Sequence, residues 1–297
     1  MRPIKLLLLG ASGQVGQAFL ALDLDTDFEL LTPDSKSINF TEPDSVYEQI
    51  MQIAPDIIVN TAAYTAVDNA ESDQIKAERV NATTPGIIAN ACQALGIPLI
   101  HISTDYVFDG KGASPYHEDD TTQPINVYGS TKLNGEALVR QNCDKHLIVR
   151  TSWVFADKGA NFVRTMLRLG QERDQLTIIN DQIGSPTYAG DIAQAILKLI
   201  GQALKADFSD WGVYHFSSAK PCSWYEFAQS IFATGEEIGL VNGNCSLKPI
   251  PTSEYPTPAA RPIYSVLDCS KIQQLGIEQP DWQAGLKRML NYIAAEN

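Results

Sequence analysis

Paired cysteines are missing from this chain of 297 residues. Its five cysteines are widely spaced and form no C-x-x-C pair; they are Cys92, Cys143, Cys222, Cys245 and Cys269. This spacing argues against a disulfide framework or a zinc site and favours a reducing compartment. The four histidines, at positions 101, 117, 146 and 215, are equally isolated. The sequence therefore predicts no metal site.

The chain also lacks a long apolar run and an excess of positive charge. The apolar start, residues 1–10, is too short for a signal peptide, and no stretch approaches the roughly 18 apolar residues of a membrane span. Lys and Arg number 22 against 35 Asp and Glu, a net charge of -13, which disfavours nucleic-acid binding. We therefore expect a cytoplasmic protein with no membrane or nucleic-acid partner. Binding of a small anion remains compatible with this net charge, because a few N–H groups and Arg side chains can bind one phosphate locally.

Short apolar segments alternate with helical stretches in the first half of the chain. The predicted strands are 4–9, 28–31, 56–60, 98–103 and 147–151, and the predicted helices are 15–22, 44–53, 75–95 and 127–141. This βαβ order predicts a Rossmann-type, doubly wound parallel sheet in an α/β protein.

The second half is less regular. Helices are predicted over 162–171 and 190–204, and strands over 176–180 and 212–217. Residues 248–262 hold five of the 16 prolines, which predicts an extended loop with neither helix nor inner strand. The length indicates about two domains. We predict an NAD(P)-binding domain over 1–152, with a returning segment at about 188–217, and a smaller mixed α/β substrate domain over 153–187 and 218–297.

A glycine-rich loop, Gly10-Ala-Ser-Gly13-Gln-Val-Gly16, joins the first predicted strand to the first helix. Glycine allows a tight turn and close approach of the backbone to a pyrophosphate, and the helix N-terminus supplies N–H donors. Ser12 adds a hydroxyl donor. The position favours dinucleotide binding over a plain turn.

The end of the second strand bears on the choice of cofactor. An acid there binds the ribose 2′-hydroxyl of NAD and repels the 2′-phosphate of NADP. This chain has Thr32 instead, and Lys36 follows, which favours NADPH. NADH stays as the alternative, because Asp34 can reach the ribose. Asn39 and Phe40 flank the adenine, or else form a helix cap and a core aromatic.

Tyr128 and Lys132 lie four residues apart, on one face of a predicted helix. A neighbouring ammonium favours phenolate and brings the pKa of tyrosine towards the range needed for acid catalysis. Upstream, Ser103, Thr104 and Asp105 end a strand at the edge where α/β sheets bind ligands. These hydroxyls bond a substrate oxygen or, alternatively, cap the next turn. The order of loop, hydroxyl and Tyr/Lys pair is stronger evidence than any one motif.

These motifs together resemble the extended short-chain dehydrogenase/reductase superfamily. Longer runs resemble its dTDP-4-dehydrorhamnose reductase family, from the first strand to residue 290; they include VNTAAYTAVDNAE (59–71), STDYVFDG (103–110), NVYGSTKLNGE (126–136), RTSWVF (150–155), NDQIGSPT (180–187) and YPTPAARP (255–262).

The resemblance implies an NADPH-dependent reduction of the 4-keto group of dTDP-4-dehydro-L-rhamnose to dTDP-L-rhamnose, the last step in making this nucleotide sugar. Tyr128 would protonate the carbonyl oxygen, Lys132 would tune Tyr128 and hold the nicotinamide ribose, and Thr104 would bond the reacting oxygen. The implied substrate residues are Thr104, Asp105, Trp153 and Arg261. The implied cofactor residues are Gly10, Ser12, Gly13, Gln14, Val15, Gly16, Thr32, Asn39, Phe40, Ala62, Ala63, Tyr64, Thr65, Tyr128 and Lys132.

Some members of the family are Mg²⁺-linked dimers through glutamates. Gly190 occupies one expected glutamate position, so we find no Mg²⁺ ligands in this sequence, and a homodimer stays open. Two other functions also stay open: a non-catalytic regulatory subunit with the same fold, and a reductase or epimerase of another nucleotide sugar. Retention of Thr104, Tyr128 and Lys132 argues against the first. Thr104-Asp105-Tyr106 lacks the Asp-Glu pair of dehydratases, which disfavours dehydration.

Overall fold

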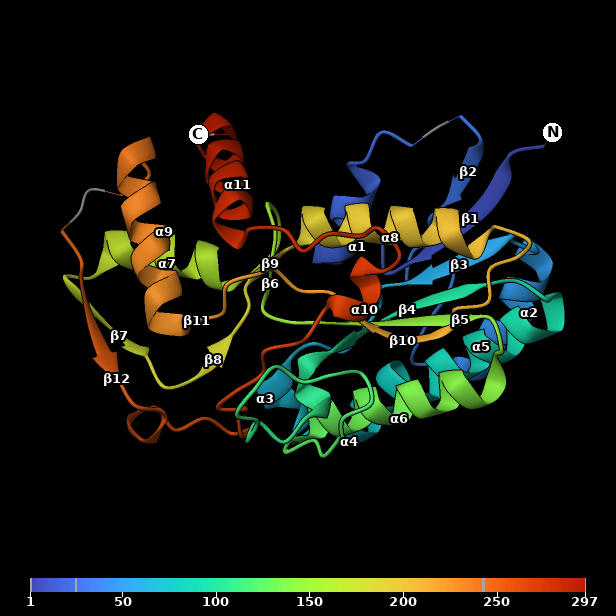
Figure 1. Cartoon of the computed structure of the whole chain (residues 1–297), viewed down its shortest axis with the longest axis horizontal. Helices are drawn as coiled ribbons and strands as arrows, with labels where there is room; N and C mark the ends of the chain where they lie inside the picture. The colour runs from blue at the N-terminus through green and yellow to red at the C-terminus, as the bar shows by residue number, and fades with distance from the viewer. Residues whose placement is uncertain (1, 25, 242–243, 297) are drawn as a thin grey trace.

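Six parallel strands form the central sheet of the computed structural model, which describes residues 2–24, 26–241 and 244–296. In spatial order the strands are β10 (Gly212–His215), β5 (His146–Thr151), β4 (Leu99–Thr104), β3 (Ile57–Asn60), β1 (Ile4–Leu9) and β2 (Phe28–Leu31). Helices cover both faces (Figure 1). The predicted Rossmann-type fold class is confirmed.

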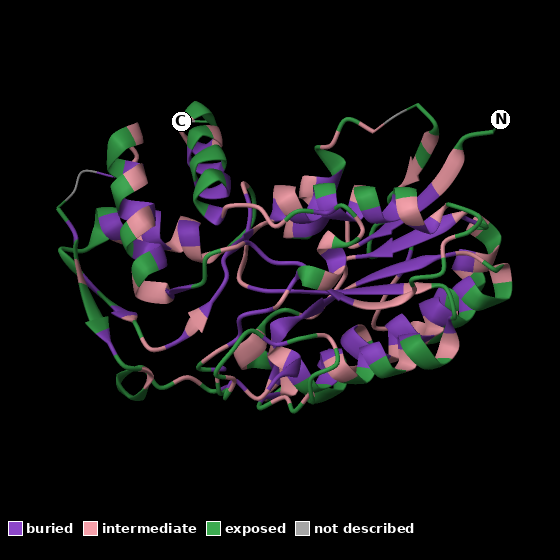
Figure 2. Ribbon diagram, viewed as in Figure 1, coloured by how far each residue is buried: buried purple, intermediate pink, exposed green. Residues whose placement is uncertain are grey.

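Both faces of the sheet are buried, as the near-continuous apolar strands require. Successive residues of β1 point to opposite sides: Leu6 and Leu8 join one apolar cluster, and Leu7 and Leu9 join another. The first cluster includes α1 (Gln14–Leu20) and α8 (Ala189–Ala203). The second includes α2 (Pro43–Ile53), α5 (Thr84–Leu95) and α6 (Val127–Asn142). Figure 2 shows buried residues through the sheet and the inner sides of these helices.

A separate apolar cluster lies in the lobe at the left of Figure 1. Its helices are α7 (Phe162–Glu172), α9 (Trp224–Ile238) and α11 (Trp282–Glu296). Three strand pairs accompany them: β7 (Gln175–Ile179) with β12 (Ser246–Ile250), β8 (Ile183–Gly184) with β11 (Cys222–Ser223), and β6 (Val154–Phe155) with β9 (Thr187–Tyr188). Ser223 and Glu226 form a reciprocal capping box that starts α9.

The predicted helix 75–95 is interrupted. It follows the short α3 (Val67–Ala70) and consists of α4 (Gln74–Glu78), a π-helical turn η1 (Arg79–Thr83) and α5. Pro85 has no N–H for the carbonyl of Asn81, which explains why the regular hydrogen-bond ladder stops there. The prediction of one continuous α-helix was wrong at this turn.

The proline-rich segment is more ordered than predicted. Residues 248–250 belong to β12, and Thr252–Glu254 form a 3₁₀ turn, η3. Proline is tolerated in β12 because this strand pairs on one side only. The prediction that the whole segment is a loop was therefore wrong, whereas the exclusion of an inner strand holds.

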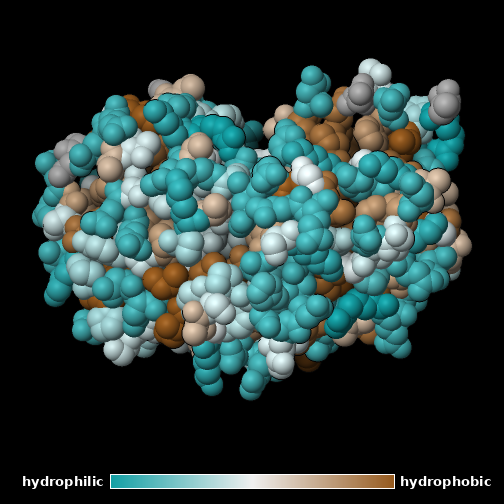
Figure 3. All heavy atoms as spheres, in the orientation of Figure 1, coloured by the Kyte–Doolittle hydropathy of each residue, from teal (hydrophilic) through white to brown (hydrophobic). Residues whose placement is uncertain are grey.

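The face of the molecule seen in Figure 3 is mostly hydrophilic, with small separate apolar patches and a notch between the two lobes. Within the described residues, no helix combines the length and apolar character needed to cross a bilayer. All five cysteines are buried and free.

Candidate active site

The predicted site residues gather along the carboxyl edge of the sheet. The glycine loop follows β1, residues 61–65 follow β3, Thr104 ends β4, and Trp153 comes two residues after β5. In the sheet, β2 lies on one side of β1, whereas β3, β4 and β5 lie on the other side. This reversal is the switch point at which doubly wound sheets bind ligands.

The glycine loop is tightly folded against the end of β3. Gly10 has φ +82°, and a Cβ there would lie 2.4 Å from the Ala62 amide nitrogen. A Cβ on Gly16 would lie 2.2 Å from the Gly10 carbonyl oxygen. Gly13 is the N-cap of α1, and Gln14 Oε1 is buried without a hydrogen-bond partner among the described residues. This backbone cradle and its unpaired polar atom fit a dinucleotide.

The residues predicted to choose the cofactor lie beyond β2. Thr32 follows the last residue of the strand directly. Asp34 Oδ1 accepts hydrogen bonds from the amides of Lys36 and Ser37 and from the Ser37 hydroxyl, and these bonds lower the pKa of the carboxyl. Asp34 therefore already has partners within its own turn. Asn39 likewise bonds the Thr41 amide, at 3.0 Å.

Asn81 holds the segment that contains Ala63, Tyr64 and Thr65. Its side chain is fully buried and makes two bonds to the Tyr64 backbone, accepting from N at 2.8 Å and donating to O at 3.1 Å. It also donates to Thr131 Oγ1 on α6, at 3.1 Å. Sequence reasoning missed this residue, because a π-helical turn has no readable periodicity.

Helix α6 carries Tyr128 and Lys132. Asn126 caps it by accepting from the Gly129 amide at 2.7 Å, and it also donates to Ala260 O at 2.8 Å. A Cβ on Gly129 would lie 2.1 Å from the Tyr106 carbonyl oxygen, so only glycine allows this approach. The half-buried Tyr128 ring meets Tyr106 edge-on, with centroids 5.7 Å apart.

The Lys132 ammonium is almost fully buried, with 1% of the residue exposed. It donates to Ile102 O at 2.7 Å and lies 3.3 Å from His101 Nε2. Burial lowers the pKa of Lys132 to about 8, against the opposing effect of Glu136. Burial and the Lys132 charge also keep the pKa of His101 low, so the imidazole is neutral.

The pKa of Tyr128 moves opposite to the prediction. Burial raises it to about 12, the Asp105 charge adds to the rise, and only a hydrogen bond with Thr104 opposes it. The predicted lowering by Lys132 is absent among these described groups, because the ammonium is held by the β4 backbone. The phenol therefore stays protonated at neutral pH.

The hydroxyls at the end of β4 divide into two roles. Thr104 Oγ1 donates to Asp105 Oδ1 at 3.0 Å, and the Thr104 hydroxyl also lowers the pKa of Tyr128. Ser103 instead donates to Glu136 Oε1 at 2.6 Å, away from Tyr128. Thr104, and not Ser103, is therefore the hydroxyl beside the phenol.

A buried ion pair lies behind Lys132. Arg150 Nε and Nη2 contact Glu136 Oε1 and Oε2 at 2.9 and 2.7 Å, and the two side chains are 2% and 0% exposed. Arg150 also lies 3.3 Å from His215 Nε2. Neither partner is identifiable from spacing, because they come from α6 and β5.

Trp153 adopts φ +46° and stacks on Trp224, with ring centroids 3.5 Å apart and planes 5° apart. A Cβ on Gly184 would lie 2.5 Å from the Trp153 ring. Thr104 pairs in register with Thr151, so Trp153, two residues after Thr151, lies at the same edge of the sheet as Thr104. Trp224 was missed, since it lies 71 positions further along the chain.

Arg261 is engaged within the protein. Its Nη1 and Nη2 each donate to one oxygen of Asp68 at 2.8 Å, which ties the proline-rich segment to α3. Contact between Arg261 and a diphosphate remains a prediction, and such a ligand would compete with this carboxylate.

The residues around position 190 do not fit a shared metal. The Tyr188 ring fills the space beside Gly190, where a Cβ would lie 2.4 Å from a ring carbon. Asp191 is paired with Arg288. In the described part of the chain, no group of three or more His, Cys, Asp or Glu could hold a metal ion.

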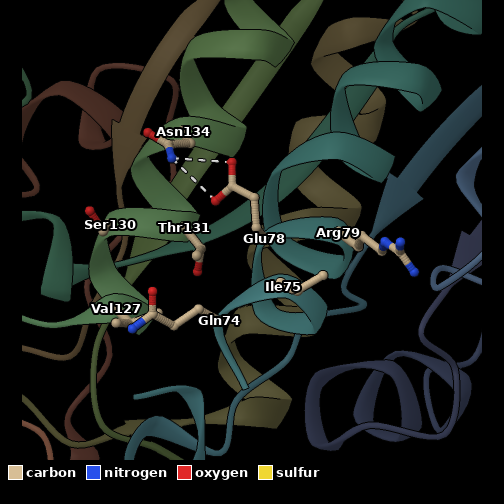
Figure 4. A pocket seen from close by; sticks show the side chains of 8 residues that line it. All are labelled: Gln74, Ile75, Glu78, Arg79, Val127, Ser130, Thr131 and Asn134. Carbon is tan, nitrogen blue, oxygen red and sulfur yellow. Dashed lines mark hydrogen bonds between the residues drawn. The ribbon is translucent and has the colours of Figure 1, made fainter. Parts of the chain in front are cut away.

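A hollow of about 470 Å³ opens between α4 and α6 (Figure 4). Glu78 accepts from Asn134 there, as the dashed lines show, and Ile75 is 74% exposed. Thr131, between Tyr128 and Lys132 on α6, lines it, but neither of those two side chains does. It is separate from the predicted catalytic group.

Comparison with known proteins agrees with this geometry. The family described as RmlD substrate binding domain matches residues 4–295. The dTDP-4-dehydrorhamnose reductase of Escherichia coli K12 is 45% identical over 98% of each chain. A crystal structure of a dTDP-4-dehydrorhamnose reductase from Clostridium acetobutylicum superposes with a TM-score of 0.90, at 35% identity, covering 98% of this chain and 99% of that one. The same enzyme from Bacillus anthracis, in complex with NADP, gives 0.89 at 38% identity with the same coverage. The predicted resemblance is confirmed, and the chain belongs to the dTDP-4-dehydrorhamnose reductase family.

Proposed function

We propose that this protein reduces the 4-keto group of dTDP-4-dehydro-L-rhamnose to give dTDP-L-rhamnose, with NADPH as the reductant. The observation that carries the proposal is that Thr104, Tyr128 and Lys132 lie at the same edge of the sheet as the glycine loop. Two relatives that are 45% and 44% identical over 98% of each chain bear the name of that activity.

NADPH, when bound, supplies the hydride that reaches C4 of the sugar. Tyr128 is the proton donor, since its raised pKa keeps the phenol protonated until negative charge develops on the carbonyl oxygen. Ile102 O holds the Lys132 ammonium at this edge of the sheet, where it would bind the nicotinamide ribose. Thr104 donates to the same carbonyl oxygen and stabilises its developing charge.

The nucleotide sugar binds between the two lobes in this proposal. The stacked Trp153 and Trp224 offer an aromatic surface to the deoxysugar. Residues 1–152 with about 188–217 would hold the cofactor, and 153–187 with 218–297 would hold the sugar nucleotide. A homodimer and a cytoplasmic location stay predictions.

A coupled assay tests the proposal. The 4-keto substrate is generated in place by upstream enzymes, and NADPH or NADH oxidation is followed at 340 nm. Tyr128→Phe should lose at least about a hundredfold in kcat, the usual contribution of an acid catalyst. Tyr47→Phe, on the exposed surface of α2, is the matched control and should retain full activity. Absence of oxidation by the intact protein would overturn the proposal.

A further inference from the structure

The Thr104 hydroxyl has three polar neighbours and only one proton to donate. Its oxygen accepts from the Tyr106 amide at 3.2 Å and lies 3.0 Å from Asp105 Oδ1. The Tyr128 phenol is the third neighbour. A hydroxyl offers one donor and two acceptor positions. The protonation state of its neighbours therefore decides where the Thr104 proton points.

Asp105 is the neighbour whose state can change. Its side chain is buried, with 2% of the residue exposed, and Oδ2 makes no hydrogen bond to any described residue. The groups that favour its charge are the hydroxyls of Thr104 and Ser265 and the amide of Tyr106, with no cation among them in the described ranges. The two phenols that face it, Tyr106 and Tyr128, are neutral. Burial raises the pKa of Asp105 to about 7.

The two forms of Asp105 orient Thr104 differently. A carboxylate can only accept, so it holds the Thr104 proton on Oδ1 and leaves a Thr104 lone pair facing the substrate oxygen. The Thr104 lone pair and the substrate oxygen are both acceptors, so no hydrogen bond forms between them. A carboxylic acid can donate to Thr104 Oγ1 instead. This bond and the Tyr106 amide fill both acceptor positions of Thr104, so its proton is released from Asp105 for the carbonyl oxygen, to which the Tyr128 phenol also donates.

We propose that Asp105 is a positioning residue for the reduction, whose carboxylic acid form donates to Thr104 and turns the Thr104 proton towards the reacting carbonyl oxygen. No bond forms to Asp105, and its own proton stays on the carboxyl during hydride transfer. The inference rests on the proposed reduction, because it assigns the use of a hydroxyl in that site.

A substrate-free measurement tests the hydrogen-bond chain first. The protein is labelled with ¹³C at aspartate carboxyl carbons, and Asp105→Asn identifies the Asp105 signal. We expect a titration midpoint near pH 7, because burial raises the pKa of this carboxyl. A midpoint near 4, close to the ordinary value of about 3.9, would overturn the inference, because Asp105 would then be a carboxylate at every working pH. This result does not depend on turnover.

The pH dependence of kcat tests the catalytic consequence. Asparagine keeps a donor to Thr104 at every pH, so Asp105→Asn should not lose activity through this ionisation. Dividing the variant profile by the wild-type profile removes ionisations that both share, including that of Lys132. The ratio should rise by up to about a hundredfold from pH 6 to pH 9, since one ionisation near 7 changes the protonated fraction tenfold per pH unit above it.

Asp119→Asn, which alters an exposed carboxyl, is the control and should give a constant ratio. A constant ratio for Asp105→Asn would refute the positioning role while leaving the reductase proposal intact. A wild-type protein without reductase activity at any pH would instead refute the proposed function, and the carboxyl titration would still show whether Asp105 ionises near neutral pH.

Discussion

Removing one partner of the buried Arg150–Glu136 pair should lower the free energy of unfolding more than removing any exposed charge. The two side chains are 2% and 0% exposed, and the contact is bidentate, at 2.9 and 2.7 Å. In Arg150→Met, the Glu136 carboxylate keeps only the Ser103 hydroxyl as a hydrogen-bond partner among its described contacts, and Lys132 is the one cation left near it there. An uncompensated buried charge costs about 3–5 kcal/mol.

The magnitude depends on the charge, not on the side-chain volume. Arg150→Met and Glu136→Leu should each lower the free energy of unfolding by about 3–5 kcal/mol, whereas the double variant should recover most of that loss, because an apolar pair in place of a buried ion pair is often neutral. The exposed pair Arg168–Glu172, at 60% and 50% exposure, is the matched control. Its coupling energy should not exceed about 0.5 kcal/mol.

Urea unfolding followed by circular dichroism gives the four free energies of each cycle. Single variants that cost less than about 1 kcal/mol would refute the argument, since the buried charge would then be compensated by other groups. A double variant that costs the sum of the singles would refute it as well, because the loss would then come from packing and not from charge.

Two further predictions concern the ligand sites. Gly16→Ala should weaken NADPH binding measured by calorimetry, because the added Cβ would lie 2.2 Å from the Gly10 carbonyl oxygen. Gly201→Ala has open space at its Cβ, so it is the control and should bind NADPH normally. Equal affinities of the two variants would contradict the proposed cradle. Trp224→Ala should raise KM for the sugar nucleotide about fivefold, with kcat less affected, because it loses about 1 kcal/mol from an aromatic stack. An unchanged KM would exclude Trp224 from holding the Trp153 ring.

The sheet and the glycine loop could be predicted because local patterns encode them. Buried parallel strands require apolar runs, and the turn after β1 requires small residues where backbone segments nearly touch. The spacing of Tyr128 and Lys132 likewise places both on one face of α6. The π-helical turn could not be predicted, because its cause, Pro85, also fits the first turn of an ordinary helix.

Contacts between distant segments were beyond sequence reasoning. Trp224 reaches Trp153, and Asp68 captures Arg261, only after both lobes have folded. The prediction that the pKa of Tyr128 is lowered was wrong for the same reason. The spacing placed an ammonium near the phenol, but burial of the phenol and the attachment of Lys132 to Ile102 depend on tertiary packing.

One stripe of α6 links the reacting groups to the stability of the sheet. Tyr128, Lys132 and Glu136 follow at four-residue intervals, so they share a face directed at β4 and β5. The cap at Asn126 fixes where this helix begins, and the Arg150 contact with Glu136, six residues before the helix ends, holds it against β5. The Glu136 charge that anchors the helix also opposes the loss of the Lys132 proton. A change in the buried pair must therefore alter the titration of Lys132 as well as the free energy of unfolding, because the same carboxylate serves both.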